Sequence, residues 1–446
     1  MSGLETQIAA LAAEQDRLSQ AIAQRRAQGQ AFDELREQAR ALSQQIKALK
    51  AQAAPPTADA SEPSAPARQA RAEVLTTAQQ VLALQPEWGE LLAHSSAASP
   101  FMTWEWMSAW YEVYGAAGQS RCLAIRDAAD RLIGLAPLFL STHRDPVLPP
   151  GHLGWASSYG PSWGIYLEPI SADGEQLRVA EALVEHLDAT SSEWRCVKLV
   201  RVPAESRILG ELIQAAAARR WRLAIKPSLV AVTADLPADP QDFGEQLPSR
   251  KRGKNNRQAA RRLQRDHPDH RFRCCRDAEE LEHCLERLAE LNITRRANLE
   301  AKSNFVDERF RACFATALRR FWEGGWLRVA ILEVGKEIAA LWTYLVYRER
   351  LYVLQPAFDV RYAAYEPSHL LLVFAVQEAI AAGARSLDFL TGAHSYKLQY
   401  AAGRRQIVDI TIWDNRLRGA WEVSRETIWA AARSTAKRLL KRAERT

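Results

Sequence analysis

The stretch 365–400 constrains the fold of this chain more strongly than any other part of its sequence. Pro367 suits the first turn of a helix, residues 370–380 are apolar on almost every side, and Gly383 supplies a stop signal. A helix that is apolar all round must be buried, so we expect this one to pack under a sheet. The run 386–390 that follows it predicts a strand of that sheet.

Polar side chains gather in and after this predicted strand, and open α/β sheets bind ligands at the carboxyl ends of their strands. Histidine side chains ordinarily titrate near neutrality, so His394 can act as a base. Tyr396 and Lys397 can donate hydrogen bonds to a carbonyl or a phosphate. We therefore predict four catalytic residues in this region: Asp388, His394, Tyr396 and Lys397.

A structural alternative exists for two of these residues. A single histidine such as His394 can be an ordinary hydrogen-bonded loop residue. Burial would raise the pKa of Asp388 unless a cation or backbone donors compensate. An ion pair of Asp388 with Lys397 or Arg385 would then be purely structural.

Length and composition set the broad class of the protein. The chain has 446 residues, 47% of them hydrophobic, and this length favours two or three domains. The sequence shows no secretory signal pattern and no run near the ~18 apolar residues that span a bilayer, which predicts a cytoplasmic protein. The six cysteines form no CxxC pair and no His/Cys ligand spacing, which favours idle thiols over metal or disulfide use.

The two ends of the chain differ in composition from the middle. Residues 1–50 carry two heptad-like segments that are out of phase, which favours a coiled-coil helical hairpin with a capacity for self-association. The hairpin sequence is similar to the antiparallel arm of seryl-tRNA synthetases. Residues 51–73 are rich in Ala, Pro and Ser and predict a disordered linker, whereas residues 417–446 predict a basic helix.

The middle of the chain presents a similar order of elements twice. Residues 237–416 predict an order of α-α-β-β-β-α-β-α-β, with strands at 326–333, 338–347 and 351–358 before the apolar helix. Residues 74–236 predict a comparable order, which ends in two short strands at 221–225 and 229–235. The fold class is therefore α/β, with two duplicated mixed sheets and flanking helices.

Two further segments are candidates for substrate binding. Basic residues follow three- and four-residue steps along 250–265, and a helix there would place Arg250, Lys254, Arg257, Arg261 and Arg265 on one face. This face can be merely solvated, or it can bind an anionic substrate, a lipid headgroup or RNA. His152 and Tyr159 lie in a glycine-rich loop that can line an acceptor cleft, although loop packing explains them equally well.

Several motifs in this order resemble the GNAT superfamily. More narrowly, they resemble the CelD-like group of double-GNAT proteins, which are relatives of the Fem aminoacyltransferases. The resemblance covers about 100–413 and is carried by PFMTWEWMSAWYEVYG, LIGLAPLFL, SRKRGKNNRQAARRLQRD, GGWLRVAILEVGKEIAALW, YEPSHLLL and DFLTGAHSYKLQY.

The resemblance implies acyl transfer from an acyl-CoA-type co-substrate, without a metal. In GNAT folds, the strands equivalent to 351–358 and 386–390 part to admit the donor, and amides at the start of the next helix hold its pyrophosphate. The implied cofactor-binding residues are Arg361, Tyr365, Ser368 and His369. This loop departs from the family pattern, because Ala364 and Glu366 replace the usual glycines and Pro367 has no N–H to donate.

The sequence thus predicts an acyltransferase that acts on an amine or hydroxyl of a small molecule or glycan precursor, in cell-envelope or exopolysaccharide synthesis. One alternative is a Fem-like aminoacyltransferase with aminoacyl-tRNA as donor. Another is a non-catalytic coiled-coil adaptor with a degenerate GNAT body, for which the altered phosphate loop speaks.

Overall fold

The computed structural model describes residues 70–95, 99–145, 147–158, 164–392 and 394–413. The predicted hairpin and basic terminal helix lie outside these residues, as does most of the predicted linker. The last linker residues are an exception, because Arg71–Leu75 form strand β1. Within the described part of the chain, no helix combines the length and the hydropathy that crossing a membrane requires.

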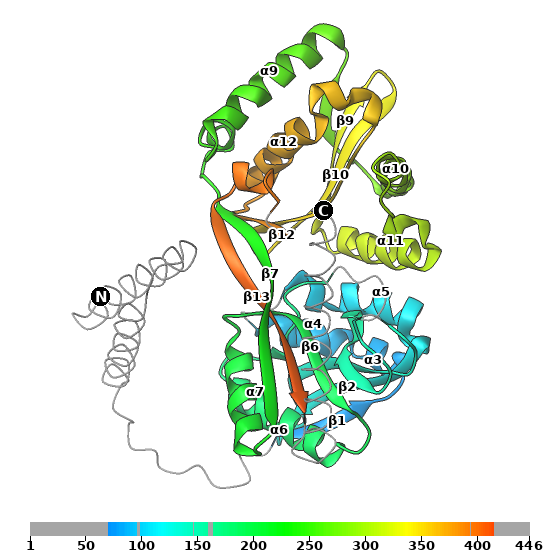
Figure 1. Ribbon diagram of the computed structural model, residues 1–446, viewed down its shortest axis with the longest axis vertical. Coiled ribbons are helices and arrows are strands. Elements are labelled where there is room, and N and C mark those ends of the chain that lie inside the picture. The colour runs from blue at the N-terminus through cyan, green and yellow to red at the C-terminus, as the bar shows by residue number, and fades with distance from the viewer. Residues whose placement is uncertain (1–69, 96–98, 146, 159–163, 393, 414–446) are drawn as a thin grey trace, which may run out of the picture. The chain divides into compact units, whose positions relative to one another are not determined.

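The first half of the described chain alternates strands and helices (Figure 1). After β1 its elements are α3 Ala78–Ala83, α4 Gln85–Ala93, α5 Trp104–Tyr114, β2 Gly118–Arg126, β3 Leu132–Ser141, β4 His152–Trp155, β5 Ile170–Ser171, α6 Gln176–Ala189, β6 Cys196–Pro203, α7 Arg207–Ala218 and β7 Arg222–Asp235. The predicted strands 221–225 and 229–235 are therefore one strand. This prediction was wrong because β7 has a strand partner along its whole length, which carries it through Pro227 with a shift of register.

The second half again combines helices and strands. Its elements are α8 Asp242–Glu245, α9 Arg250–Asp266, β8 Arg271–Cys274, α10 Ala278–Ala297, α11 Glu308–Glu323, β9 Leu327–Val334, β10 Glu337–Tyr347, β11 Arg350–Phe358, the 3₁₀ helix η6 Val360–Tyr365, α12 Pro367–Ala381, β12 Ser386–Thr391, the 3₁₀ helix η7 Lys397–Gln399 and β13 Gly403–Trp413. Side-chain caps begin α9, α10 and α11, from Ser249, Asp277 and Asp307 respectively.

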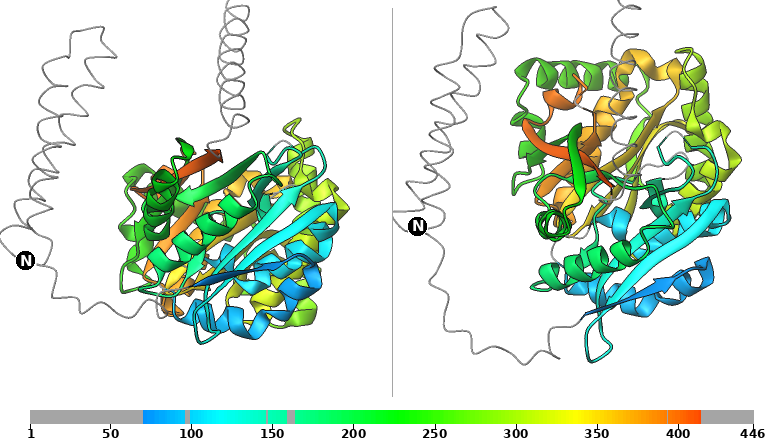
Figure 2. Two further views of the ribbon diagram at one scale, coloured as in Figure 1. Left: turned by 90° about the horizontal axis from the view of Figure 1, so that it is seen from below. Right: turned by 60° about the horizontal axis from the view of Figure 1, so that its bottom comes forward.

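The strands form one sheet in the order β1-β2-β3-β4-β6-β13-β7-β12-β11-β10-β9-β8, with β5 beside β3. The sequence predicted two separate sheets, and the exchange of two strands corrects this. β13 comes from the second half but pairs with β6, while β7 comes from the first half but pairs with β12. The two exchanged strands pair with each other along β13, and they run side by side in Figures 1 and 2.

Helices cover both faces of the second half of the sheet. Successive residues of β9 alternate between two cores: Val329 and Ile331 join the core that contains α10, α11 and the first half, whereas Ala330 and Leu332 join the core that contains α9 and α12. A sheet buried on both faces requires strands that are apolar at almost every position, as β9 and β10 are. The predicted burial of the apolar helix is confirmed, since α12 packs against β9, β10 and β11.

Candidate functional site

Strands β11 and β12 pair at their beginnings and then part. Their parallel pairing includes Tyr352 opposite Asp388 and ends there. Beyond that point β11 continues along β10, with a bulge at Leu354, while β12 turns toward β7 through an irregularity at Leu390, whose φ is +55°. The two strands therefore leave a gap next to Asp388, and bulges in both strands open it.

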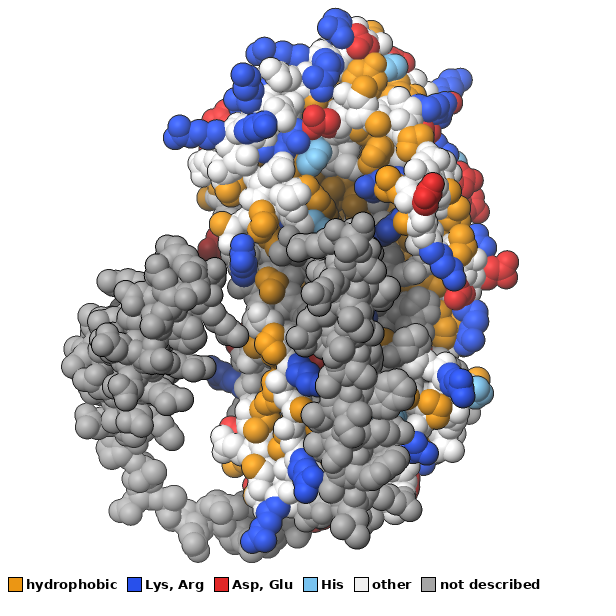
Figure 3. Space-filling model, in the orientation of Figure 1, with side chains coloured by type: hydrophobic (Ala, Val, Ile, Leu, Met, Phe, Trp, Pro, Cys, Tyr) orange, Lys and Arg blue, Asp and Glu red, His pale blue; other side chains and the backbone are white. Residues whose placement is uncertain are grey.

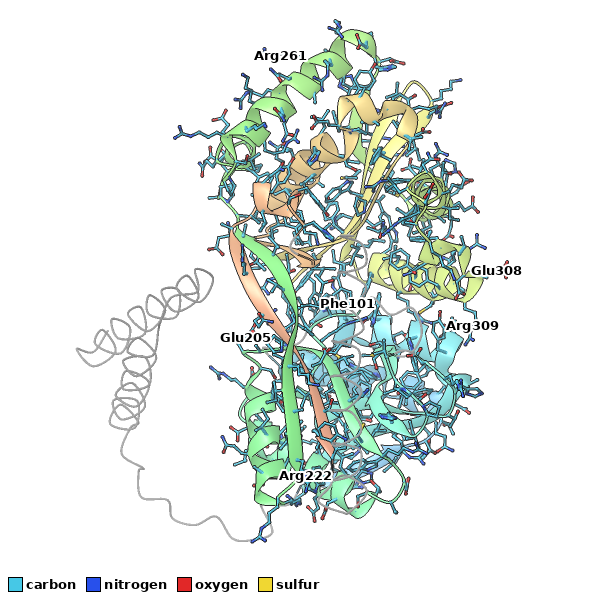
Figure 4. The ribbon with its side chains drawn as sticks, viewed as in Figure 1. Phe101, Glu205, Arg222, Arg261, Glu308 and Arg309 are labelled. Atoms are coloured by element: carbon cyan, nitrogen blue, oxygen red, sulfur yellow. The ribbon has the colours of Figure 1, made fainter. Side chains whose placement is uncertain are left out.

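Two hollows adjoin this gap. The larger has a volume of about 870 Å³ and is lined by the parted ends of both strands, by α10, and by first-half residues that include Phe101. Phe101 lies in Figure 4 near the boundary of the two halves. The smaller hollow has a volume of about 380 Å³ and lies at the start of α12. Arg295, Pro356 and Tyr396 line both hollows, so the gap is accessible from two sides.

Asp388 is completely buried beside the gap, with 0% of its surface exposed. Its carboxyl group accepts a hydrogen bond of 2.6 Å from the Tyr166 hydroxyl and one of 2.7 Å from the Leu390 N–H. Burial raises the pKa of Asp388, although both hydrogen bonds oppose the shift. The carboxyl group thus ties the first half of the chain to the point where the strands part, and it does not make the ion pair considered from the sequence.

The ammonium group of Lys397 lies just beyond Asp388 and is almost completely buried. It donates to the carbonyl oxygens of Phe389 (2.8 Å) and Thr391 (2.6 Å). Burial lowers the pKa of Lys397 to about 8, and the charge of Asp388 opposes this shift. Lys397 lines the larger hollow. It therefore places a cation there that can give up its proton close to neutral pH.

His394 and Tyr396 also line the larger hollow. His394 is exposed, and its ring stacks on that of Tyr396 with 6.3 Å between centroids. Gly392 has a φ of +90°, and a Cβ there would lie 2.8 Å from His394 Nε2, so this turn requires a glycine. The four residues predicted as catalytic thus lie at one gap; whether they act in catalysis stays a prediction.

The start of α12 differs from an ordinary anion-binding helix terminus. Glu366 is its N-cap, in the left-handed conformation, and makes no side-chain cap. The N–H groups of His369 and Leu370 are already donated to the Glu366 carbonyl, and Pro367 has none. Ser368 is left to offer an amide at this end of the hollow.

The four residues predicted to bind the cofactor divide into two groups. Ser368 and His369 line the smaller hollow. Arg361 forms ion pairs with Asp359 and Glu337, both at 2.8 Å, and Tyr365 donates to Asp266 at 3.3 Å. These partners hold Arg361 and Tyr365 within the η6 loop, so a phosphate at Arg361 would compete with the carboxylates of Asp359 and Glu337.

The basic segment forms α9, with Leu263 buried on the side opposite the charges, as the sequence predicted. Its exposed face carries Arg250, Lys254, Arg257, Arg261 and Arg265. Figure 3 shows blue side chains gathered over α9, at the upper left of the molecule. Figure 4 shows Arg261 on the outer side of the helix. None of these five side chains lines the two hollows at the gap.

The predicted acceptor loop is only partly described. Tyr159 lies outside the described residues. His152 is buried in β4, where it pairs with Cys196 of β6, so it belongs to the sheet and not to an open loop. The sequence misled us here because the glycines around His152 allow close packing of a short strand.

Sequence reasoning missed Arg295, which lies on α10 and lines both hollows. Its guanidinium lies 4.9 Å from the centre of the Phe358 ring, and it has no ion-pair partner among the described residues. Burial lowers its pKa, and the neighbouring Arg296 adds to that effect. The sequence gave no signal for Arg295, because an arginine beside a hollow and an arginine on the open surface of an amphipathic helix follow the same pattern.

Comparisons with known proteins agree with this geometry. Residues 250–398 match the family model described as an acetyltransferase (GNAT) domain. This chain therefore contains a GNAT domain. The matched segment begins with α9 and ends just after Lys397, so it includes the gap and all four predicted catalytic residues.

Solved structures show likeness to the whole described chain. FemX is 11% identical, with a TM-score of 0.53, over 76% of this chain and 96% of that chain, which shows a shared fold. A conserved protein of unknown function from Bacteroides thetaiotaomicron VPI-5482 is 13% identical over 76% and 100%, with a TM-score of 0.49. A tandem GNAT protein from the clavulanic acid biosynthesis pathway is 11% identical over 78% and 99%, with a TM-score of 0.42. No curated protein matches the sequence significantly.

Proposed function

We propose that this protein transfers an acyl group from an activated thioester or ester donor to an amine or hydroxyl acceptor, at the gap between β11 and β12. The parting of these strands after Tyr352 carries the proposal. Beyond the parting, the edge of β11 that faces β12 has no strand partner among the described residues. Backbone groups on such an edge must find other partners, and a donor with amide groups supplies them.

The fold supports an arrangement in two parts. We assign residues 74–236 and 237–416 to two GNAT-like domains, of which the second holds the donor. The larger hollow receives the acceptor, since residues of both halves line it. A small molecule or a glycan precursor is the acceptor that we propose, in keeping with the resemblance of the sequence.

The chemistry divides between His394 and Lys397. His394, exposed at the edge of the larger hollow, takes the proton of the attacking amine or hydroxyl. The ammonium of Lys397 stabilises the oxyanion that forms on the carbonyl. Because its pKa of about 8 is close to that of a thiol, Lys397 can also return a proton to a leaving thiolate. Asp388 has no access to substrate and acts as a positioning residue.

Ligand binding and two variants test this proposal. Acetyl-CoA, a long-chain acyl-CoA or CoA should raise the melting temperature, because a ligand that binds only the folded state stabilises it. With the donor that binds, His394→Ala and Lys397→Ala should each lower kcat by about 100-fold or more. Tyr114→Phe, on α5 and outside both hollows, is the control. Full turnover in both His394→Ala and Lys397→Ala would show that the chemistry lies elsewhere.

A second candidate donor is aminoacyl-tRNA, and two observations favour it. The start of α12 has few free amides for a pyrophosphate, and the exposed face of α9 carries five cations. Phosphate contacts release counterions, so a tRNA complex should weaken steeply between about 50 and 200 mM salt. Gel shifts with Arg257→Glu/Arg261→Glu, compared with the exposed control Arg222→Glu on β7, test it. Equal binding by both variants would exclude α9 as the tRNA surface.

A further inference from the structure

A chain of hydrogen bonds links α9 to the wall of the smaller hollow. Arg252 is buried in α9, forms an ion pair with Glu366, and donates its Nε–H to Asn256 Oδ1 at 2.9 Å. Asn256 contacts the hydroxyl of Tyr400, which lies 2.8 Å from His369 Nδ1. The His369 ring stacks on Tyr400 at 5.7 Å and forms part of the wall.

The donor and the acceptor of each hydrogen bond in this chain can be assigned by starting from Arg252. A guanidinium can only donate, so Asn256 Oδ1 accepts from Arg252 and its Nδ2 amide remains to donate. That amide lies 3.2 Å from the Tyr400 oxygen. The Tyr400 O–H could point back to Asn256 Oδ1 at 3.3 Å, but His369 Nδ1 is closer, at 2.8 Å, and no other donor in the described part of the chain contacts it. The geometry favours a Tyr400 hydroxyl that donates to Nδ1, with the ring proton on Nε2.

The surroundings also keep the imidazole uncharged. Burial lowers the pKa of His369 to about 4, and the positive charge of Arg252 adds to this effect, while Glu366 opposes it. Nε2 has no hydrogen-bond partner among the described residues. At neutral pH the smaller hollow thus faces an uncharged N–H donor that the protein itself does not use.

We propose that His369 binds the donor substrate through this neutral Nε2–H, which donates to a carbonyl-type oxygen. Asn256 and Tyr400 are positioning residues that fix the tautomer. This inference rests on the proposed function, because it concerns the donor that enters beside β11. A carbonyl oxygen suits this donor, because an uncharged N–H offers one neutral hydrogen bond and no positive charge for a phosphate.

Nuclear magnetic resonance of the ligand-free protein tests the tautomer without any substrate. The nitrogen shifts of a ¹⁵N-labelled imidazole distinguish the Nε2–H form, the Nδ1–H form and the charged ring. Nine histidines are present, and His369→Gln identifies the signal that belongs to His369. We expect the Nε2–H form from pH 6 to 8 in the wild type and a mixture of both forms in Tyr400→Phe. An Nδ1–H or charged ring in the wild type overturns the inference.

Two probes then test the contact with ligand. Acetyl-CoA and pantetheine both carry amide carbonyls, and pantetheine has no phosphate. We expect the Nε2–H signal of His369 to move with both, and His369→Leu to weaken pantetheine binding by about fivefold, the loss of one neutral hydrogen bond. His369→Gln keeps an N–H near Nε2 and should retain most of the affinity. Tyr114→Phe, on α5 and outside both hollows, is the control for loss of a tyrosine hydroxyl.

The outcomes separate this inference from the proposed function. If neither probe moves the His369 signal, the inference is wrong, even where turnover with another donor shows that the transferase proposal stands. If both probes move the signal but no acyl transfer occurs, the inference stands and the proposed function fails.

Discussion

In the described part of the chain, a helix connects two parallel strands in two places, and these two places differ in how much space they leave. In the first half α6 leads back to β6 beside β4, and in the second half α12 leads from β11 to β12. The hollow lined by Leu153 of β4 and Leu187 of α6 has a volume of about 10 Å³. The hollows next to β11 have volumes of about 380 and 870 Å³. The same connectivity therefore gives a filled core in one place and a candidate site in the other.

Local sequence explains much of this difference. Beside β4, a Cβ on Gly154 would meet Leu148 and the backbone oxygen of Lys198 within 3 Å, so the strands and their cover are packed tightly. In β11 the bulge at Leu354 and the missing N–H of Pro356 weaken any continued pairing toward β12. The comparison indicates that bulges and a proline, more than the order of elements, decide where a sheet opens.

The largest expected effect comes from separating the two halves. Residues 237–416 alone lack β7, and β12 and β13 would then lose a neighbouring strand. Unpaired strand edges promote aggregation, so we expect this fragment to be insoluble, whereas the chain from residue 70 to 416 stays soluble. Coexpression with residues 70–236 should recover soluble protein. A soluble fragment 237–416 with cooperative unfolding would show that the halves are independent.

Two substitutions that each enlarge a leucine side chain compare the filled region of the first half with the open region of the second half. Leu187→Phe adds atoms where about 10 Å³ is free and should cost about 1–3 kcal/mol of unfolding free energy. Leu372→Phe on α12 points into about 380 Å³ and should cost less than 1 kcal/mol. Urea unfolding measures both variants. Equal losses would mean that the second hollow closes in solution.

Removing the hydroxyl that joins the halves should have a smaller effect. Tyr166→Phe takes one of two hydrogen bonds from the buried carboxyl group of Asp388. We expect a loss of about 1–2 kcal/mol in unfolding free energy, together with a further rise in the pKa of Asp388, because the hydroxyl lowers that pKa. Tyr365→Phe, whose hydroxyl contacts Asp266 at the surface, should change stability little. Similar results for both variants would argue against the link.

The last expected effect is a pH dependence at Lys397, which is modest for each pH unit. The pKa of Lys397 is about 8 in the folded protein, against about 10.4 in an unfolded chain. Between these values the unfolded chain binds more protons, so the unfolding free energy of the wild type rises with pH. Relative to Lys397→Met, the gain should reach up to about 1 kcal/mol per pH unit above pH 8. Urea unfolding of both proteins at pH 7.5 and 9.5 measures this gain. An equal change with pH in the wild type and in Lys397→Met would show that the pKa of Lys397 is not near 8.

Much of the second half could be predicted from the sequence, because its signals are local. The apolar run before Gly383 predicted a buried helix, and α12 is buried; the basic steps before Asp266 predicted a helix with one charged face, and α9 has it. The same local information brought Asp388 and Lys397 to one strand end. Arg295 could not be found in this way, because its place beside the gap depends on how α10 crosses β11.

Local patterns in the sequence were enough to predict the periodicity of helices and strands, the apolar positions and the residues that follow β12, since these depend on neighbours a few positions away. The exchange of β7 and β13, the hydrogen bond between Tyr166 and Asp388, and the chain of hydrogen bonds from Arg252 to His369 depend instead on tertiary contacts. These features join residues more than 100 positions apart. Their energies come from burial and pairing, which exist only once the chain has folded.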